Sequence, residues 1–142
     1  MGEIIVDSPV DGVAKHVRSY LESNGADGGI YHGHHALLIT TRGRRSGTLR
    51  RTALMYGPDG DRYLLVASNG GSAQHPYWYL NLCADPQVEL QVGAEKFRGM
   101  ARTATAEERP RLWQVMTGVF PTYARYQEGT EREIPVVVVE RA

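Results

Sequence analysis

The sequence predicts a mainly β domain of the α+β class, in which about six antiparallel strands form a small closed or split barrel with helices packed outside it. Three observations favour this fold. Six short β-favouring runs alternate with turns, and helical periodicity is confined to three segments. The chain has 142 residues, of which 42% are hydrophobic, which suits one compact domain with its own core.

The first expected element is an amphipathic helix over residues 9–23, where apolar residues recur at helical spacing. Its apolar side would pack on its own domain, or alternatively meet a membrane surface or a partner. Residues 24–29 include three glycines and should form a flexible join. We therefore divide the chain into residues 1–29, the helix with its join, and residues 30–142, a single barrel domain.

Three β-favouring runs follow at residues 36–41, 52–56 and 63–67. Because they follow one another through turn-forming segments, we expect them to pair as an antiparallel meander. Residues 76–83 suit a short helix, which should end before Pro86 because the residue preceding a proline disfavours helical geometry.

The second half of the chain continues the barrel. Residues 88–92 and 96–105 read as two strands joined by a glycine turn. Residues 107–127 carry the longest helical pattern, which Pro121 should bend or split. Residues 134–139 include four consecutive valines, as in a strand that is buried on both faces.

Overall composition excludes several classes of protein. The formal net charge is zero, so there is no protein-wide positive field of the kind that gathers nucleic acid. Cys83 is the only cysteine, which rules out an intrachain disulfide. No stretch is apolar for long enough to cross a bilayer, and the N-terminus lacks the apolar run of a signal peptide. We expect a cytoplasmic protein, with membrane contact through the N-terminal helix as the alternative.

Residues 40–51 hold five arginines around a turn with two glycines and contain no acidic residue. Guanidinium groups fit phosphate and carboxylate oxygens two at a time, and glycine lets the backbone pass close to a ligand. The pattern therefore favours an external anion over a solvated hairpin tip. A nucleic-acid-binding module is less favoured, because aromatic residues are not interleaved with the arginines.

Familiar catalytic motifs are absent: the sequence has no phosphate-loop lysine motif, dinucleotide fingerprint, nucleophile elbow or metalloprotease helix. The run His32-Gly33-His34-His35 invites a metal site, since neighbouring imidazoles can share an ion. No carboxylate or cysteine stands at a supporting spacing, so we predict no metal.

Taken together, the chain resembles the deazaflavin-dependent nitroreductase family, split-barrel oxidoreductases that use coenzyme F-420, an 8-hydroxy-5-deazaflavin with a phosphate-bearing polyglutamate tail. The resemblance covers residues 36–139 and includes the arginine turn. It rests on four ordered blocks, at residues 41–47, 66–71, 75–82 and 120–136. It implies a split β-barrel of the FMN-binding type and a deazaflavin-binding domain at residues 30–142.

The resemblance also implies a binding site for the coenzyme. A deazaflavin has a strongly charged arm and an aromatic ring, so it needs an anion-binding entrance and an apolar floor. The residues expected to meet the phosphate and the tail are Arg44, Arg45, Ser46, Gly47 and Arg50, and those expected around the ring are Ser68, Asn69, Gly70, Pro76 and Trp78.

In family terms, Tyr123 and Tyr126 are the catalytic residues. They lie three positions apart, so on a helix they share one face and can present two hydroxyls to the same electron acceptor. The implied reaction is hydride transfer from the reduced deazaflavin to a quinone, a nitroaromatic or an activated alkene, while the tyrosines polarise the acceptor oxygen. The alternative for both is packing within an amphipathic helix.

Two other readings remain open. The same arginines would hold the phosphates of FMN or FAD in a split-barrel reductase, or the protein would bind the deazaflavin without turning it over. Split barrels of this kind often pair, so a homodimer is one expected partner.

Overall fold

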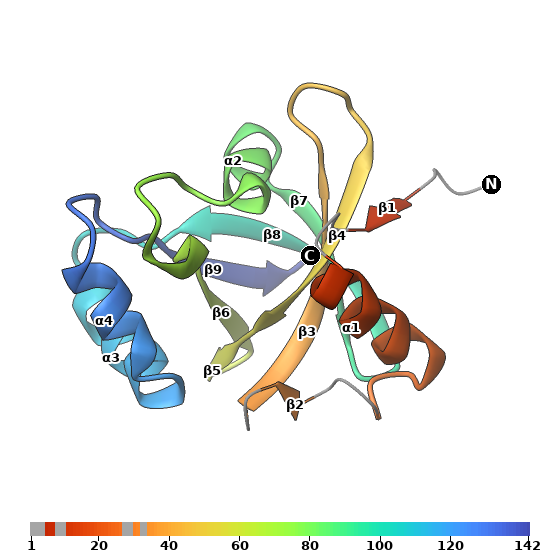
Figure 1. The fold of residues 1–142 in the computed structure, drawn as a ribbon, viewed down its shortest axis with the longest axis horizontal. Coiled ribbons are helices and arrows are strands. Elements are labelled where there is room, and N and C mark those ends of the chain that lie inside the picture. The colour runs from red at the N-terminus through yellow and green to blue at the C-terminus, as the bar shows by residue number, and fades with distance from the viewer. Residues whose placement is uncertain (1–4, 8–10, 27–29, 32–33) are drawn as a thin grey trace.

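A computed structural model describes the chain except for residues 1–4, 8–10, 27–29 and 32–33 (Figure 1). All six strands expected from the sequence are present, with bounds shifted by a few residues, and three short strands join them. The elements are β1 (Ile5–Asp7), α1 (Asp11–Glu22), β2 (Ile30–Tyr31), β3 (His34–Arg42), β4 (Leu49–Met55), β5 (Gly57–Asp59), β6 (Arg62–Val66), η1 (Asn69–Gly71), α2 (Tyr77–Ala84), β7 (Gln87–Val92), β8 (Glu95–Thr103), α3 (Arg109–Val119), α4 (Thr122–Glu128) and β9 (Val136–Arg141).

The strands form one sheet in the order β1-β4-β3-β7-β8-β9-β6-β5, and β2 pairs with β3. Neighbouring strands are antiparallel except β1, which runs parallel to β4. The expected meander is confirmed for its first two strands, since β3 and β4 pair in antiparallel fashion, and wrong for the third. β4 pairs with β1 and β3, whereas β6 pairs with β5 and β9. Because β4 and β6 are consecutive long strands that do not pair, the barrel is split between them.

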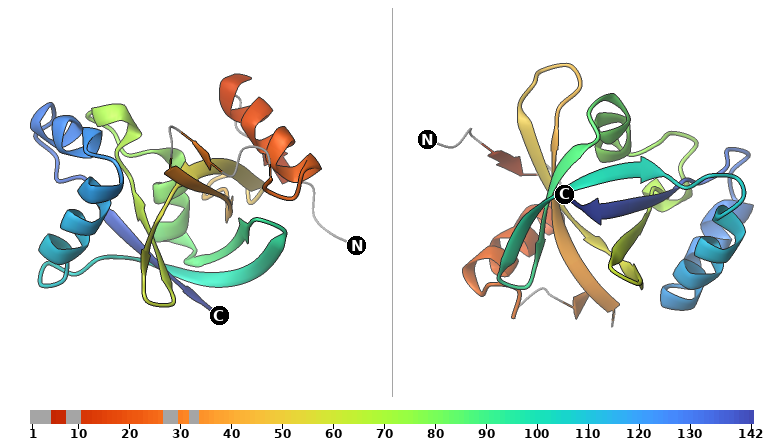
Figure 2. Two further views of the ribbon diagram at one scale, coloured as in Figure 1. Left: turned by 90° about the horizontal axis from the view of Figure 1, so that it is seen from below. Right: turned by 180° about the vertical axis from the view of Figure 1, so that it is seen from behind.

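Helices cover the outside of this split barrel. Figures 1 and 2 show α3 and α4 together on one side and α1 on the opposite side, with α2 beside the turn that joins β3 to β4. The long helical pattern is divided as expected, since α3 ends before Pro121 and α4 begins directly after it. Among the described helices, none has the length and apolar character required to span a membrane.

The four valines of the last strand, β9, are buried on both faces as predicted, and its last two residues, Glu140 and Arg141, are exposed. Val137 and Val139 pack with Leu65 and Leu90 inside the barrel. Val136 and Val138 belong to the second core, under α3 and α4. One strand thus links two of the hydrophobic clusters that the described residues form.

Helix α1 is fixed to the barrel by Tyr20. Its ring is buried with Val17 against Leu38 of β3. The Tyr20 hydroxyl accepts a hydrogen bond from the Gly93 N–H at 2.7 Å and lies 3.2 Å from the carbonyl oxygen of Gln91. The helix and the β7–β8 turn therefore hold each other in place.

The histidine run considered for a metal site falls partly outside the described residues, because His32 and Gly33 are not among them. The same holds for residues 27–29 of the expected join.

Candidate functional site

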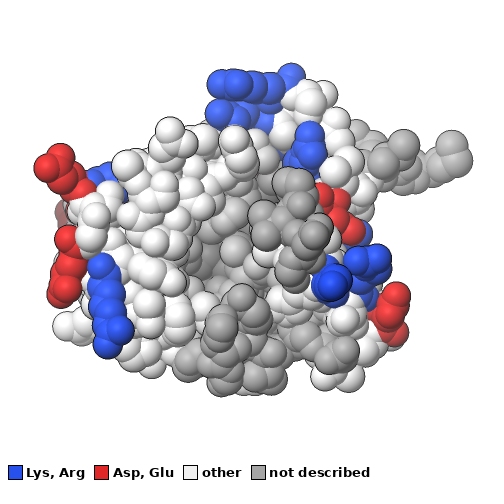
Figure 3. Space-filling view, viewed as in Figure 1, with Lys and Arg blue, Asp and Glu red and all other residues white. Residues whose placement is uncertain are grey.

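The opening between β4 and β6 is a cleft with a volume of about 1230 Å³. It is bordered by the β3–β4 turn, β4, the loop after β6, α2 and α4, and it also reaches Val6, Asp7 and Val13 near the N-terminus. Figure 3 shows a hollow in this face, with basic side chains gathered at the top of the molecule, over the β3–β4 turn. The cleft thus has a cationic end.

Every site residue predicted from the sequence lines this cleft except Gly47. The fold therefore brings together three regions that lie far apart in the chain, at residues 44–50, 68–78 and 123–126. The lining residues that were predicted are Arg44, Arg45, Ser46, Arg50, Ser68, Asn69, Gly70, Pro76, Trp78, Tyr123 and Tyr126.

The β3–β4 turn is held by its own backbone. The Gly43 N–H donates to the Thr48 carbonyl at 2.7 Å, and the Gly47 N–H donates to the Gly43 carbonyl at 2.8 Å. Gly47 has a φ of +72°, which glycine adopts without strain. The Ser46 hydroxyl oxygen accepts a bond from the Thr48 N–H at 3.1 Å. Gly47 thus shapes the turn rather than the cleft wall.

Three arginines of this turn region, Arg44, Arg45 and Arg50, are exposed at the rim. None of them makes an ion pair within the part of the chain that the structure describes. Arg51 differs, because its guanidinium bonds to the carboxylate of Asp7 at 2.6 Å. The five arginines of the run therefore divide into three groups. Arg51 is paired with Asp7 on the β1 side. Arg42 donates to the Gly47 carbonyl of its own turn at 2.7 Å, and the other three are exposed to solvent.

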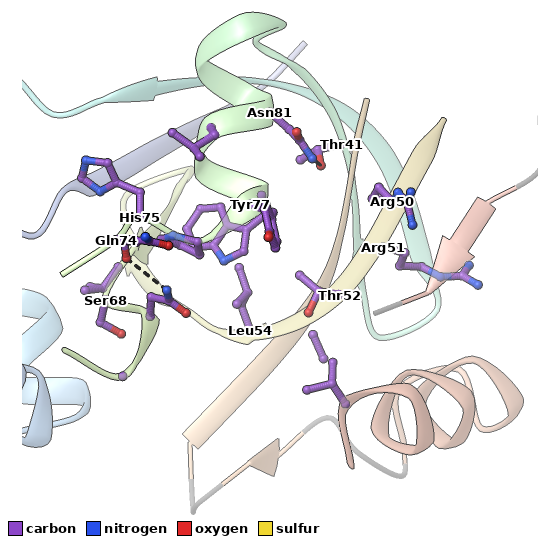
Figure 4. A pocket seen from close by; sticks show the side chains of 18 of the residues that line it. Thr41, Arg50, Arg51, Thr52, Leu54, Ser68, Gln74, His75, Tyr77 and Asn81 are labelled. Carbon is purple, nitrogen blue, oxygen red and sulfur yellow. Dashed lines mark hydrogen bonds between the residues drawn. The ribbon is translucent and has the colours of Figure 1, made fainter. Parts of the chain in front are cut away.

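Helix α2 fastens the turn to the cleft through Asn81, which the sequence analysis did not single out. Its side-chain oxygen accepts a bond from the Arg44 N–H at 3.1 Å, and its Nδ2 group donates to the Thr41 hydroxyl at 3.2 Å. Asn81 and Thr41 are both buried. An asparagine among the apolar residues of this short helix is the signal that marks it. Figure 4 shows Asn81 and Thr41 side by side.

The loop after β6 has an unusual backbone. Ser68 is right-handed, whereas Asn69, Gly70 and Gly71 have φ values of +48°, +64° and +81°. A right-handed residue followed by a left-handed one is typical of backbone nests that present N–H groups to an anionic or electron-rich atom. The Asn69 side chain donates to the Gln74 carbonyl at 3.0 Å, which closes the loop (Figure 4).

The two tyrosines of α4 stand at the opposite end of the cleft from the arginine turn. Tyr123 is 5% exposed, and its ring lies edge-on to Phe120 and to Tyr126, with centroid distances of 5.0 and 6.4 Å. Burial raises the pKa of Tyr123 to about 12, so its hydroxyl stays protonated at neutral pH. A protonated hydroxyl at this position is a hydrogen-bond donor.

Arg132, in the segment between α4 and β9, is a second residue that the sequence analysis did not assign. Its guanidinium donates to the Ser68 carbonyl at 2.6 Å and to the Ser72 carbonyl at 2.8 Å. It lies in a polar stretch where neither periodicity nor a motif distinguishes it from its neighbours, so only the folded arrangement identifies it.

The cleft therefore fits a ligand with an anionic arm and a flat ring. Exposed guanidinium groups stand at one end, while Leu54, Trp78 and Phe120 provide apolar surface further in. Tyr123 and Tyr126 line the end of the cleft away from the arginine turn. Tyr77, at the start of α2, is 78% exposed and also lines the cleft (Figure 4).

Comparison with known proteins identifies the relatives of this chain. The profile of the F420H(2)-dependent quinone reductase family matches residues 13–141. An F420H(2)-dependent quinone reductase of Mycobacterium tuberculosis (strain ATCC 25618 / H37Rv) is 42% identical over 109 residues, which are 75% of this chain and 73% of that protein.

Two solved structures agree. The structure of an F420-H2 dependent reductase (FDR-A) shares 40% sequence identity at a TM-score of 0.69, covering 74% of this chain and 93% of that one. A structure described as a domain-swapped dimer shares 36% identity at a TM-score of 0.71, covering 94% of this chain and 100% of that one.

Proposed function

This chain belongs to the F420H(2)-dependent quinone reductase family, and we propose that it binds the reduced deazaflavin coenzyme F-420 in the cleft between β4 and β6 and reduces a quinone. When bound, the coenzyme supplies the hydride, so the chain itself needs no redox-active group. The observation that carries the proposal is the cleft itself, with arginines at its rim that have no carboxylate partner among the described residues, and with the buried Tyr123 and the half-buried Tyr126 at its other end.

The arginine turn is the proposed binding site for the phosphate and the glutamate tail. Arg44, Arg45 and Arg50 are exposed and have no carboxylate partner among the described residues, so their full hydrogen-bonding capacity is available. Ser46 adds a hydroxyl whose proton is free to donate, since its oxygen is the acceptor within the turn. Gly47 contributes through the turn conformation.

The ring is proposed to lie deeper, between the loop after β6 and α2. Ser68, Asn69 and Gly70 present backbone N–H groups and a hydroxyl there, while Pro76 and Trp78 supply apolar surface. This arrangement holds a flat aromatic group without placing a carboxylate beside it.

Tyr123 and Tyr126 are proposed to act on the electron acceptor. A quinone oxygen gains negative charge as the quinone accepts a hydride, and a hydroxyl donor already in place stabilises that charge. The raised pKa of Tyr123 keeps its proton on the phenol, so it donates a hydrogen bond and does not ionise. Nitroaromatics and activated alkenes carry comparable acceptor groups and are the other proposed substrates.

The decisive experiment is anaerobic mixing of the purified protein with reduced coenzyme F-420 and menadione, followed by absorbance as the deazaflavin is reoxidised. Faster reoxidation than in buffer supports a reductase. Tight coenzyme binding without acceleration by any quinone or nitro compound identifies a non-catalytic binding protein. Stoichiometric FMN on the isolated protein would instead favour a flavin reductase.

A homodimer is the proposed assembly. A similar structure, 36% identical over 94% of this chain, is described as a domain-swapped dimer. Light scattering on the eluting protein measures the mass in solution, and a mass near 15.8 kDa would contradict a dimer.

A further inference from the structure

The side chain of Arg132 makes four contacts with a single loop. Its Nε donates to the Ser72 carbonyl at 2.8 Å, and its terminal nitrogens donate to the carbonyls of Ser68 at 2.6 Å and Ala67 at 3.2 Å. A terminal nitrogen also lies 3.0 Å from Nδ1 of His75. The guanidinium therefore holds both ends of the segment from the end of β6 to the start of α2.

The contact with His75 fixes the state of that ring. Because a guanidinium only donates, Nδ1 of His75 must accept, and the neutral ring carries its proton on Nε2. Burial, and then the charge of Arg132, lower the pKa of His75, which keeps the ring neutral. Figure 4 shows the imidazole pointing away from the cleft. His75 is thus an anchor for the loop.

The backbone of Arg132 is bound to a different element. The side-chain amide of Gln127, on α4, donates to the Arg132 carbonyl at 2.8 Å, and its oxygen accepts the Ile134 N–H at 2.8 Å. The segment that carries Arg132 is therefore tied to the helix that bears Tyr123 and Tyr126.

The loop and α4 also touch directly. A Cβ added at Gly71 would stand 3.2 Å from the Cα of Tyr126, and Gly71 has a φ of +81°, so another residue here would be strained and would move the loop and α4 apart by a few tenths of an ångström. The loop that borders the ring site and the helix that carries the tyrosines are consequently in van der Waals contact, and Arg132 joins the same two elements.

We propose that Arg132 is a positioning residue, which sets the distance between the Ser68–Gly70 loop and the tyrosines of α4 by binding the loop with its side chain and α4 with its backbone. The inference rests on the proposed function, in which the coenzyme lies against the loop and the acceptor against α4. Transfer between two bound molecules falls steeply when they are misplaced by about 1 Å. A lysine would keep the charge but would not span four acceptors.

The test uses the full-length Arg132→Lys variant, with Arg125→Lys as the matched control. Arg125 is an exposed arginine on α4 that lies outside the cleft lining. Amide hydrogen exchange on the coenzyme-free proteins should accelerate about tenfold across residues 67–75 in the first variant only, since at least two hydrogen bonds to that segment are lost. Exchange at the parental rate would show that Arg132 does not hold this loop and would overturn the proposal.

The kcat and KM values of the variant distinguish a positioning role of Arg132 from a general effect on stability. In Arg132→Lys, kcat with menadione should fall about tenfold while KM for menadione stays within about twofold, because the acceptor site on α4 is intact. Unchanged kcat alongside accelerated exchange would overturn the positioning role. If the parent itself reoxidises no deazaflavin, the proposed function fails. The exchange experiment still decides whether Arg132 holds the loop at residues 67–75. Should Arg132→Lys not fold, the same two measurements are made on His75→Gln, which removes a single contact.

Discussion

Arginines at two places on the surface have opposite surroundings. On the α3 side, Arg111 bonds to both carboxylate oxygens of Asp59, at 2.9 and 3.1 Å, and Arg62 bonds to the same carboxylate. These contacts hold the pKa of Asp59 well below its usual range. At the cleft rim, Arg44 and Arg45 have comparable exposure and no carboxylate partner among the described residues.

The arginines of this protein can therefore be grouped by the partners of their guanidinium groups. On the α3 side, Arg111 and Arg62 neutralise Asp59, and Arg111 joins α3 to β5. Because the Arg111 side chain is 57% exposed, its pair with Asp59 adds little stability. The arginines at the rim have no carboxylate partner among the residues that the structure describes, which is tolerable in water and useful for an anionic ligand. Arg132 forms a third class, since it binds backbone carbonyls and a neutral imidazole.

The largest effect is expected for the double substitution Arg44→Ala and Arg45→Ala, which tests whether the rim arginines bind the coenzyme. Two charge-assisted contacts would be lost, so the Kd for coenzyme F-420 should rise about a hundredfold. In the parent, affinity should fall as salt is raised, because exposed charges are screened, and this dependence should flatten in the variant. Fluorescence titration at two salt concentrations measures both.

Arg111→Ala is the matched control, because it also removes an exposed arginine. It should leave the Kd for the coenzyme within about twofold, since Arg111 is not part of the cleft. Equal weakening in the control and in the double variant would show that loss of general positive charge explains the result, and the distinction between paired and unpaired arginines would be lost.

Coenzyme binding at the arginine turn and turnover of the acceptor at α4 can be tested separately. Tyr123→Phe removes only a hydroxyl, so the Kd for the coenzyme should not change, while kcat/KM for menadione should fall about thirtyfold. Steady-state reoxidation rates measure this loss. Tyr126→Phe, on the same face of α4, shows which hydroxyl matters. Parental rates for Tyr123→Phe with every acceptor would reduce that residue to packing.

The contact between the loop and α4 can be tested by Gly71→Ala, with Gly70→Ala as the control for stability. Both glycines have positive φ, but only at Gly71 would a new methyl group meet Tyr126. Gly70→Ala should lower the free energy of unfolding by about 1 kcal/mol, and Gly71→Ala by about 2 to 3 kcal/mol. Urea denaturation measures both. Equal losses would mean that the loop shifts freely away from α4.

The sequence predicted the separate strands far better than their pairing. The valines of β9 could be recognised as buried on both faces because their side chains alone carry that information. The meander through β4 and β6 was wrong, since adjacency along the chain does not determine which strands pair. That missing pairing is what opens the cleft, so its location could not follow from local patterns.

The same limit applies to the site. The arginine turn could be predicted because its charge is concentrated in twelve residues, Thr40 to Arg51, without an acid. The pairing of Arg51 with Asp7 could not, because 44 positions separate them. Arg132 acts through acceptors that lie 57 to 65 positions away, of which three are carbonyls that every residue possesses and one is Nδ1 of His75. No residue type or spacing could have indicated that role.

The smallest effect is expected in the pH dependence of stability, which tests the contact between Arg132 and His75. In the folded protein the pKa of His75 is lowered by burial and by Arg132, so below pH 6.5 the unfolded chain takes up a proton that the folded protein does not. Stability should therefore fall as the pH drops from about 6.5. In His75→Gln this contribution is absent, so between pH 7.5 and pH 5.5 its Tm should fall by about 1 to 2 °C less than that of the parent. Differential scanning fluorimetry gives both values. Parallel curves would mean that the imidazole is not held neutral beside Arg132, and that this guanidinium differs from those at the rim only in its backbone contacts.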